Sequence, residues 1–365
     1  MLTVGIVSTM TVLYLGLLFA VAYYADNKRK TGQSIIANPY VYSLSLAVHY
    51  TSWTFYGVIG LSATNGIAFL ALYLGNTLMA FSWWFLLRKM VRISKEQHIT
   101  SIADFISSRY GKSPLLGGIV TVFSIMIIIP FIALQLKAVA YTFDLLTVSP
   151  GADGFRHMVP ALPESVDTAF IVAVFLGIFG ILFGARHLDA SERHEGLVAA
   201  VALQSVVKLI AFVTVGIFVT YGIFDGFTDI FSRFASQFPE RKHLFLLGTG
   251  QAPYATWLTL LLSTMAFVMF QPRQFQIMVI ENSHEEHIRD AMWLHPAYTF
   301  LITLFVIPIA LEGSLHTAAI QQWPTFLFLI FRCRQGIPGW PCWYSSAAFL
   351  LLQGWSWWRR WFFPP

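Results

Sequence analysis

The chain has 365 residues, of which 56% are hydrophobic and 11% charged, with a mean hydropathy of +0.64 and a formal net charge of +5. Soluble domains carry about 25% charged residues, so this composition excludes a soluble globular protein and indicates one embedded in the lipid bilayer. The apolar stretches are about 20 residues long, which favours spanning helices over the alternating strands of an outer-membrane barrel. The net charge is not evidence of nucleic-acid binding, because where the charges lie matters more than their sum, and we expect no nucleic-acid partner.

Eight apolar segments are long enough to cross a membrane as helices. In chain order they are 4–24, 39–61, 66–88, 115–142, 168–184, 195–223, 255–276 and 292–312. The loops at 25–38, 89–114, 185–194 and 277–291 hold most of the lysines and arginines. The loops on the other side hold Arg156, Arg233, Arg241 and Lys242. The positive-inside rule therefore predicts that the N-terminus lies outside.

The second segment has a polar centre. Within Ser43–Gly60, the residues from His49 to Thr54 are hydrogen-bonding or aromatic, and the glycines Gly57 and Gly60 follow. In hydrocarbon such groups are satisfied by neighbouring helices, by a water-filled cavity or by a bound solute. The pattern is typical of a broken helix beside a midplane binding site, as in secondary transporters. A helix packed inside a bundle, with its Ser and Thr bonded to their own backbone, is the alternative.

Two loops and two lysines carry further expectations. The amphipathic stretch Gln97–Ser113, with Thr100 and Asp104 near its start, predicts a short helix against the inner membrane face. The phenylalanine-rich loop 223–254 predicts an interfacial helix over the outer mouth. Lys137 and Lys208 fall within spanning segments, and we expect both near helix ends or reaching toward the interface.

The seventh segment ends in Gln271-Pro272-Arg273-Gln274. A proline followed by a charge and flanked by two glutamines is unfavourable in lipid, but is tolerated where a helix breaks beside a cavity. This second candidate break stands five segments after the first, which fits two inverted five-helix repeats that each begin with a broken helix. Two unrelated kinks are the alternative.

Six ordered motifs resemble the sodium:solute symporter family. They are SLAVHYTSWTFYGVIG (Ser45–Gly60), ITSIADFISSRYGKS (Ile99–Ser113), IALQLKAV (Ile132–Val139), FGARHLDASERHEGL (Phe183–Leu197), QSVVKLIAF (Gln204–Phe212) and QPRQFQIMVIENSHEEHIRDAMWLHPAY (Gln271–Tyr298). More narrowly, they are similar to the symporter-like N-terminal membrane domain of bacterial sensor histidine kinases. The similarity covers about residues 1–325.

The resemblance implies an all-α polytopic membrane protein of the bacterial cytoplasmic (inner) membrane. Its fold would be an incomplete LeuT-like inverted-repeat helical bundle with one extra N-terminal helix. Its partners would be the bilayer, a small-molecule solute such as an amino acid and, in the parent protein, a kinase module. Its activity would be sodium-coupled uptake, or sensing by a transport-like domain.

The resemblance also implies site residues. The backbone carbonyls of Ala47 and Tyr50 would help to bind Na⁺ at the break of the first core helix. The solute cavity would be lined by Thr51, Trp53, Tyr56, Phe270, Gln271 and Gln274. His49 stands where the proline symporters have an aspartate, and a neutral imidazole does not replace a carboxylate as a ligand for a hard cation. No metal other than sodium and no catalytic residue is expected.

The C-terminal part changes in character near Phe328. Residues 332–365 hold half of the twelve tryptophans and show no spanning period. The codons that could encode these residues, when they are read one base out of frame, can instead encode an apolar helix. We therefore divide the chain into a symporter-like domain at 1–328 and a frameshifted tail at 329–365. A natural divergent tail is the alternative.

Three functions remain open from the sequence. The chain is a sodium-dependent symporter domain, or the sensing input domain of a histidine kinase, or a non-functional truncated product. It is not expected to be an enzyme itself, because no Gly-rich ATP-binding box and no phospho-accepting histidine in a helical dimerisation context follow the membrane region.

Overall fold

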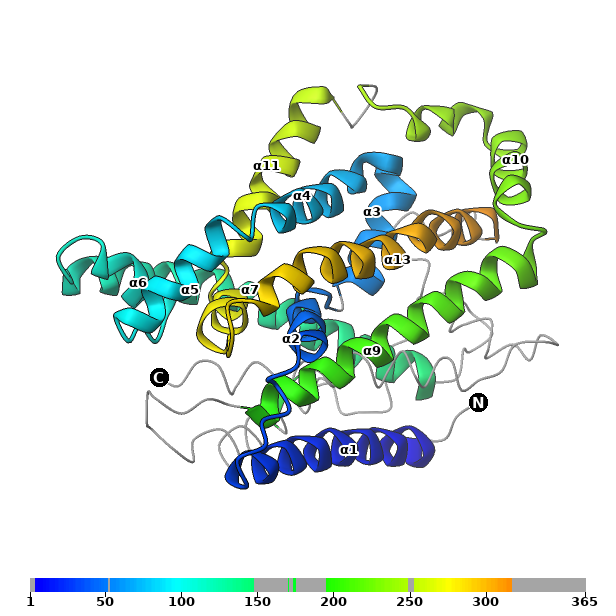
Figure 1. Ribbon diagram of the computed structural model, residues 1–365. Coiled ribbons are helices and arrows are strands. Elements are labelled where there is room, and N and C mark those ends of the chain that lie inside the picture. The colour runs from blue at the N-terminus through cyan, green and yellow to red at the C-terminus, as the bar shows by residue number, and fades with distance from the viewer. Residues whose placement is uncertain are drawn as a thin grey trace.

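The computed structural model describes residues 4–51, 53–147, 170, 173–174, 195–248 and 253–316, and these residues form helices and turns (Figure 1). The longer α-helices are α1 (Val4–Lys30), α4 (Leu70–Phe81), α5 (Leu86–Glu96), α7 (Pro114–Thr147), α9 (Glu195–Ile217), α10 (Phe227–Gln237), α11 (Tyr254–Phe270) and α13 (His287–His316). The shorter ones are α2 (Pro39–Leu46), α3 (Val58–Asn65), α6 (Ile102–Ser108) and α12 (Pro272–Phe275). The 3-10 helices are η1 (Ala47–His49), η3 (Gly66–Phe69) and η6 (Pro239–Phe245), and the π-helices are η2 (Trp53–Gly57), η5 (Phe218–Ile223) and η7 (Gln276–Ile280).

Within the described residues, five helical runs are long and apolar enough to span a membrane, namely Gly5–Lys30, Thr54–Phe81, Pro114–Val139, Glu195–Ile223 and His287–Leu315. A sixth span is the bent pair Tyr254–Phe270 and Pro272–Ile280. The prediction of an all-α polytopic membrane protein is therefore confirmed. The predicted span at 168–184 and the tail at 329–365 lie outside the described residues, except for positions 170, 173 and 174.

The predicted spans at 39–61 and 66–88 have different boundaries in the structure. The helical run through α3 and α4 turns at Gly66, whose φ of +58° is a conformation that glycine adopts without strain. α4 stops at Phe81, and α5 runs on to Glu96, where the sequence predicted a loop. α5 is amphipathic: Leu87, Val91 and Ser94 are buried one turn apart, and the basic residues Arg88, Lys89, Arg92 and Lys95 occupy other positions. Hydropathy alone does not find such a helix.

The two predicted loop helices are confirmed as helices. α6 is capped by Ser101, whose hydroxyl accepts a hydrogen bond from the Asp104 amide at 3.1 Å. α10 buries Ile230 and Phe234, and it packs against the end of α13, where Phe227 stacks on Phe305.

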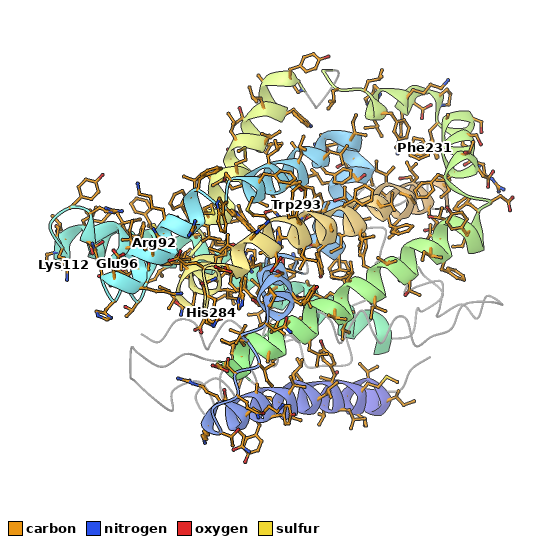
Figure 2. The ribbon with its side chains drawn as sticks, in the orientation of Figure 1. Arg92, Glu96, Lys112, Phe231, His284 and Trp293 are labelled. Carbon is orange, nitrogen blue, oxygen red and sulfur yellow. The ribbon has the colours of Figure 1, made fainter. Side chains whose placement is uncertain are left out.

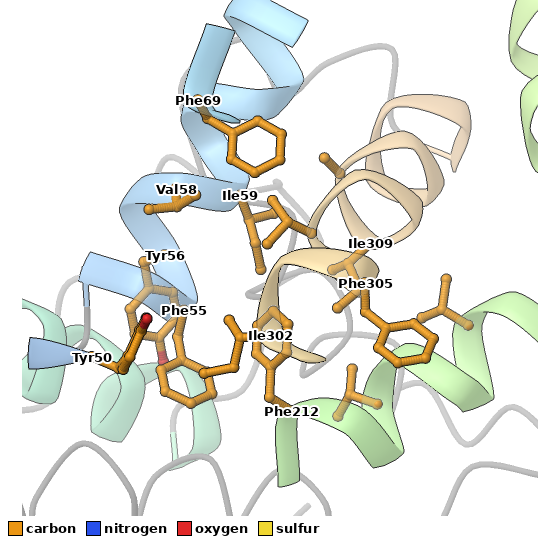
Figure 3. Close-up of a cluster of buried hydrophobic side chains, with 14 of the residues drawn as sticks. Tyr50, Phe55, Tyr56, Val58, Ile59, Phe69, Phe212, Ile302, Phe305 and Ile309 are labelled. Carbon is orange, nitrogen blue, oxygen red and sulfur yellow. The ribbon is translucent and has the colours of Figure 1, made fainter. Parts of the chain in front are cut away.

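The core lies around α13, which crosses the centre of the molecule between α9 and the α3–α4 pair (Figure 1). Small residues let these helices approach closely. A Cβ atom built on Gly216 of α9 would come within 2.1 Å of the Phe305 side chain on α13. Figure 3 shows the apolar cluster at this crossing, where Phe55, Phe212 and Ile302 meet from η2, α9 and α13. Packing of this kind places α9 and α13 on either side of the first helix break.

Candidate functional site

The helical segment that follows α1 is broken, as predicted. α2 ends at Leu46, a single 3-10 turn follows, and Tyr50 adopts an extended conformation with ψ of 108°. Helical structure resumes in η2 at Trp53. The last carbonyls of a helix lack partners within it, so a break inside a protein has to satisfy them from elsewhere. The Tyr50 amide donates to the Ala47 carbonyl at 3.0 Å, which leaves the Leu46 and Tyr50 carbonyls to be satisfied by other elements.

The Tyr50 carbonyl accepts a hydrogen bond from the ammonium of Lys208, with an N–O distance of 3.0 Å. Lys208 lies well inside α9, and its side chain is 1% exposed. The expectation that this lysine sits near a helix end or reaches the interface is therefore wrong. The residue stands on the face of α9 that packs against α2 and the break, where a long side chain points to the protein interior instead of the interface.

The Tyr50 side chain fixes the break against two other helices. Its hydroxyl is hydrogen-bonded to the Thr299 hydroxyl on α13 and accepts from the Asn76 amide on α4 at 3.3 Å. The ring packs between Tyr73 on α4 and Tyr298 on α13, with centroid distances of 6.2 and 5.1 Å. Tyr50 therefore ties the broken segment to α4 and α13 at the same time.

The second break lies at Gln271, as predicted. α11 ends at Phe270, Gln271 is extended with ψ of 127°, and Pro272 opens α12, so that the two parts of the span meet at 53°. Arg273 is buried here: its Nε donates to Gln271 Oε1 at 3.1 Å, and its guanidinium lies 4.4 Å from the centre of the Phe131 ring. Proline lacks the amide that would continue the helix, so this break has a local cause.

Two reciprocal hydrogen bonds hold the broken helices face to face. Gln274 of α12 donates from Nε2 to the Leu46 carbonyl, at the end of α2, over 3.0 Å. Tyr42 of α2 donates from its hydroxyl to the Met278 carbonyl in η7 over 2.8 Å. Each helix thus satisfies a backbone carbonyl of the other with one of its own buried side chains. Both bonds join groups more than 200 positions apart in the sequence.

The residues expected from the sequence do not all lie together. Gln274 contacts the first break at Leu46, next to Ala47, and Tyr50 and Thr51 are buried within that break. Gln271 lies at the second break, where it accepts a hydrogen bond from Arg273. The Tyr56 hydroxyl is hydrogen-bonded to the Thr142 hydroxyl of α7 at 2.6 Å. The Phe270 side chain is 53% exposed. The side chain of Trp53 is outside the described part of the structure.

Several residues of this site were missed by sequence reasoning. They are Tyr42, Asn76, Lys208, Tyr298 and Thr299. Only Lys208 carries a recognisable signal, because a charged residue inside an apolar span marks a functional position by default. His49 was noted for its position, and its ring lies edge-on to Tyr50 and Phe267, with centroid distances of 5.8 and 6.5 Å.

Beyond the second break, the chain enters an ion-pair cluster that lies away from the spans. Glu285, in the loop before α13, pairs with Arg88 at 3.0 Å and with Arg92 at 2.9 Å, both on α5. Hydrogen bonding to Arg92 holds the pKa of the Glu285 carboxyl below its usual range, and Arg88 adds to the effect. Figure 2 shows Arg92 and the neighbouring loop residue His284 at the same end of the molecule.

No family model matches the chain. The chain is 25% identical over 313 residues to the uncharacterized symporter YhjB of Bacillus subtilis (strain 168), an alignment that covers 86% of this chain and 58% of that protein. It is 32% identical over 97 residues to the uncharacterized symporter YodF of the same organism, covering 26% of this chain and 19% of that protein. The chain thus spans less than two thirds of the length of each relative. These similarities support a transporter-like membrane protein.

Proposed function

We propose that this chain is a transport-like membrane domain that binds a small solute, such as an amino acid, beside its two helix breaks. The observation that carries the proposal is the pair of reciprocal hydrogen bonds between α2 and the α12–η7 segment. Broken helices that face each other near the middle of the membrane are the usual place for solute sites in secondary transporters. The symporter names of the two relatives support the same class of function.

The chemistry beside the breaks suits a small zwitterion. Arg273 supplies a buried guanidinium of the kind that binds carboxylates. Gln271 and Thr51 supply amide and hydroxyl groups, and Trp53 and Tyr56 are proposed as aromatic walls. Phe270, at 53% exposure, is left out of this proposed cavity.

The proposed test is a binding measurement on the purified protein with a panel of labelled amino acids. We expect saturable binding of at least one of them. Gln274→Leu removes the bond to the Leu46 carbonyl and should weaken that binding by at least about tenfold, which corresponds to about 1.4 kcal/mol. Tyr40→Phe is the matched control, because Tyr40 lies on α2 near Tyr42 but is 62% exposed. Saturable binding that Gln274→Leu leaves unchanged would contradict a site at the breaks.

A second candidate is sensing, and it rests on the resemblance to the input domains of histidine kinases. In that role, solute binding would bias a kinase module in a longer parent protein. Uptake of the bound amino acid into proteoliposomes by the 365-residue chain favours transport, whereas binding without uptake favours sensing. In both roles we propose the bacterial inner membrane, with the N-terminus outside and the basic α5 at the cytoplasmic side.

A further inference from the structure

Lys208 is a buried lysine whose amino group lies at the first helix break. Among the described residues, no carboxylate lies within 4.0 Å of its ammonium. The five ion pairs between described residues all join other groups. An ammonium in a protein interior is unfavourable unless polar groups replace its water. Here the Tyr50 carbonyl does so, at 3.0 Å, at the point where the helix has opened. The position of Lys208 is thus coupled to the break itself.

The surroundings of Lys208 exclude two ordinary roles for a lysine, namely reaching the membrane interface and pairing with a described carboxylate. Its 1% exposure excludes a side chain that reaches the interface. Tyr298 of α13 donates to the Ser205 carbonyl at 2.9 Å, one turn before Lys208, and this bond holds the middle of α9 against the core. Among the described residues, the titratable rings that pack against Tyr50, whose carbonyl binds Lys208, are His49, Tyr73, His295 and Tyr298, and none of these is a carboxylate.

The Tyr50 carbonyl is the group that the family resemblance assigns to sodium. Unwound backbone carbonyls can coordinate a coupling ion in transporters of this kind. A sodium ion on this oxygen would lie against the Lys208 ammonium, which is 3.0 Å from it, and like charges at such distances repel strongly. The second expected ligand, the Ala47 carbonyl, accepts the Tyr50 amide. The residues present therefore do not fit a sodium ion at this position.

We propose that the Lys208 ammonium takes the place of sodium at the opened helix, so that the site forms and binds its solute without sodium. Lys208 is then a positioning residue: a cation tethered to α9 that holds the Tyr50 carbonyl and keeps the helix open. The inference about solute binding rests on the function proposed above. The inference about sodium does not, because it concerns only Lys208 and the break.

The test is thermal unfolding of the purified 365-residue protein in NaCl, KCl and choline chloride at equal ionic strength. An ion that binds the folded state raises the midpoint of unfolding. Because the wild type is proposed to bind no sodium here, its midpoint should differ by less than about 1 °C between the three salts. Lys208→Ala should unfold at a lower temperature in KCl and gain several degrees in NaCl, as sodium replaces the missing ammonium. Lys208→Arg keeps a tethered cation and should respond like the wild type.

Lys137→Ala is the matched control, because Lys137 is an exposed lysine in another apolar span. A midpoint that rises in NaCl alone for the wild type would overturn the proposal. So would a Lys208→Ala protein that is as stable as the wild type in KCl. If Lys208→Ala does not fold, the comparison of wild type and Lys208→Arg across the three salts still tests whether sodium stabilises a protein that has a cation at position 208. A midpoint raised by NaCl in either protein would contradict the proposal. None of these measurements needs a solute, so a failure to bind amino acids leaves their outcome intact.

Discussion

The two helix breaks have different origins. At the second break, Pro272 removes the amide that would continue α11, and the chain turns at Gln271 for a local reason. The first break contains neither proline nor glycine between Ala47 and Thr51. There, the open conformation depends on groups from α9, α12, α4 and α13, chief among them Lys208 and Gln274. One break follows from its own sequence, whereas the other is imposed by the assembled fold.

The first break therefore depends on tertiary packing, and the second depends on its own proline. A break imposed by tertiary contacts weakens when those contacts are removed, even though its own residues are unchanged. A break caused by proline persists as long as the proline is present. Substitutions at the two breaks test this contrast.

The largest effect is expected for Tyr50→Ala. This change removes a buried ring that packs between α4 and α13, together with hydrogen bonds to Thr299 and Asn76, but it keeps the carbonyl that accepts from Lys208. Large aromatic side chains cost about 3–5 kcal/mol when truncated in a packed core. Unfolding in mixed micelles of detergent and SDS measures the change. Tyr40→Ala is the control, and equal costs for the two variants would show that packing does not impose the first break.

Gln274 links the breaks, and its substitution is expected to rank second. Gln274→Leu leaves the buried Leu46 carbonyl without its donor, at a cost of about 1–3 kcal/mol. Gln274→Glu has nearly the same size but an ionised carboxylate only accepts hydrogen bonds, so it should be worse than leucine. The same unfolding assay ranks the two variants. A glutamate variant as stable as the wild type would contradict the bond to Leu46.

Tyr42→Phe extends this test to the reciprocal bond with the Met278 carbonyl. If both bonds hold the same pair of helices, the cost of the double variant should differ from the sum of the single costs by about 0.5 kcal/mol or more. Additive costs would mean that the two contacts act independently.

The sequence predicted the spans and the positions of the two breaks, but not the residues that contact the first break. Hydropathy located most spans, and the polar centre at His49–Thr54 and the motif at Pro272 indicated where helices open. The partners were not predictable, because nothing near Tyr50 points to Lys208, 158 positions away. The position of Lys208 was predicted wrongly because the sequence of an apolar helix does not show whether its lysine points to the protein interior or reaches the interface. α5 was missed because hydropathy averages out an amphipathic helix.

Pro272→Ala should have a smaller effect at the second break. Alanine restores an amide and enlarges the set of unfolded conformations, which costs about 0.4–1 kcal/mol of stability. We expect the bend to lessen, because the restored amide can continue α11 past Gln271, and amino-acid binding to weaken with it. A variant that keeps wild-type amino-acid binding would indicate that the bond from Gln274 to the Leu46 carbonyl, and not Pro272 alone, holds the second break. Unfolding and binding measured on the same preparation separate these results.

The smallest effect is expected at Glu285, where the second broken helix is connected to α5 by exposed ion pairs. Hydrogen bonding to Arg92 lowers the pKa of this carboxyl, so the ion pairs stabilise the folded protein above the pKa of the unfolded chain. That contribution is lost as the pH falls through the lower, folded-state pKa. Such pairs contribute little, so Glu285→Gln should lower the unfolding midpoint by no more than about 3 °C near neutral pH.

The difference between wild type and Glu285→Gln should shrink as the solution is acidified below about pH 4, because the wild-type carboxyl is then protonated as well. Glu286→Gln is the matched control, since Glu286 is the exposed neighbour of Glu285 in the same loop. A difference that is the same at both pH values, or equal to that of the control, would mean that the ion pairs with Arg88 and Arg92 do not anchor this loop. The stability of the second break would then rest on Pro272 and the contacts of α12 alone.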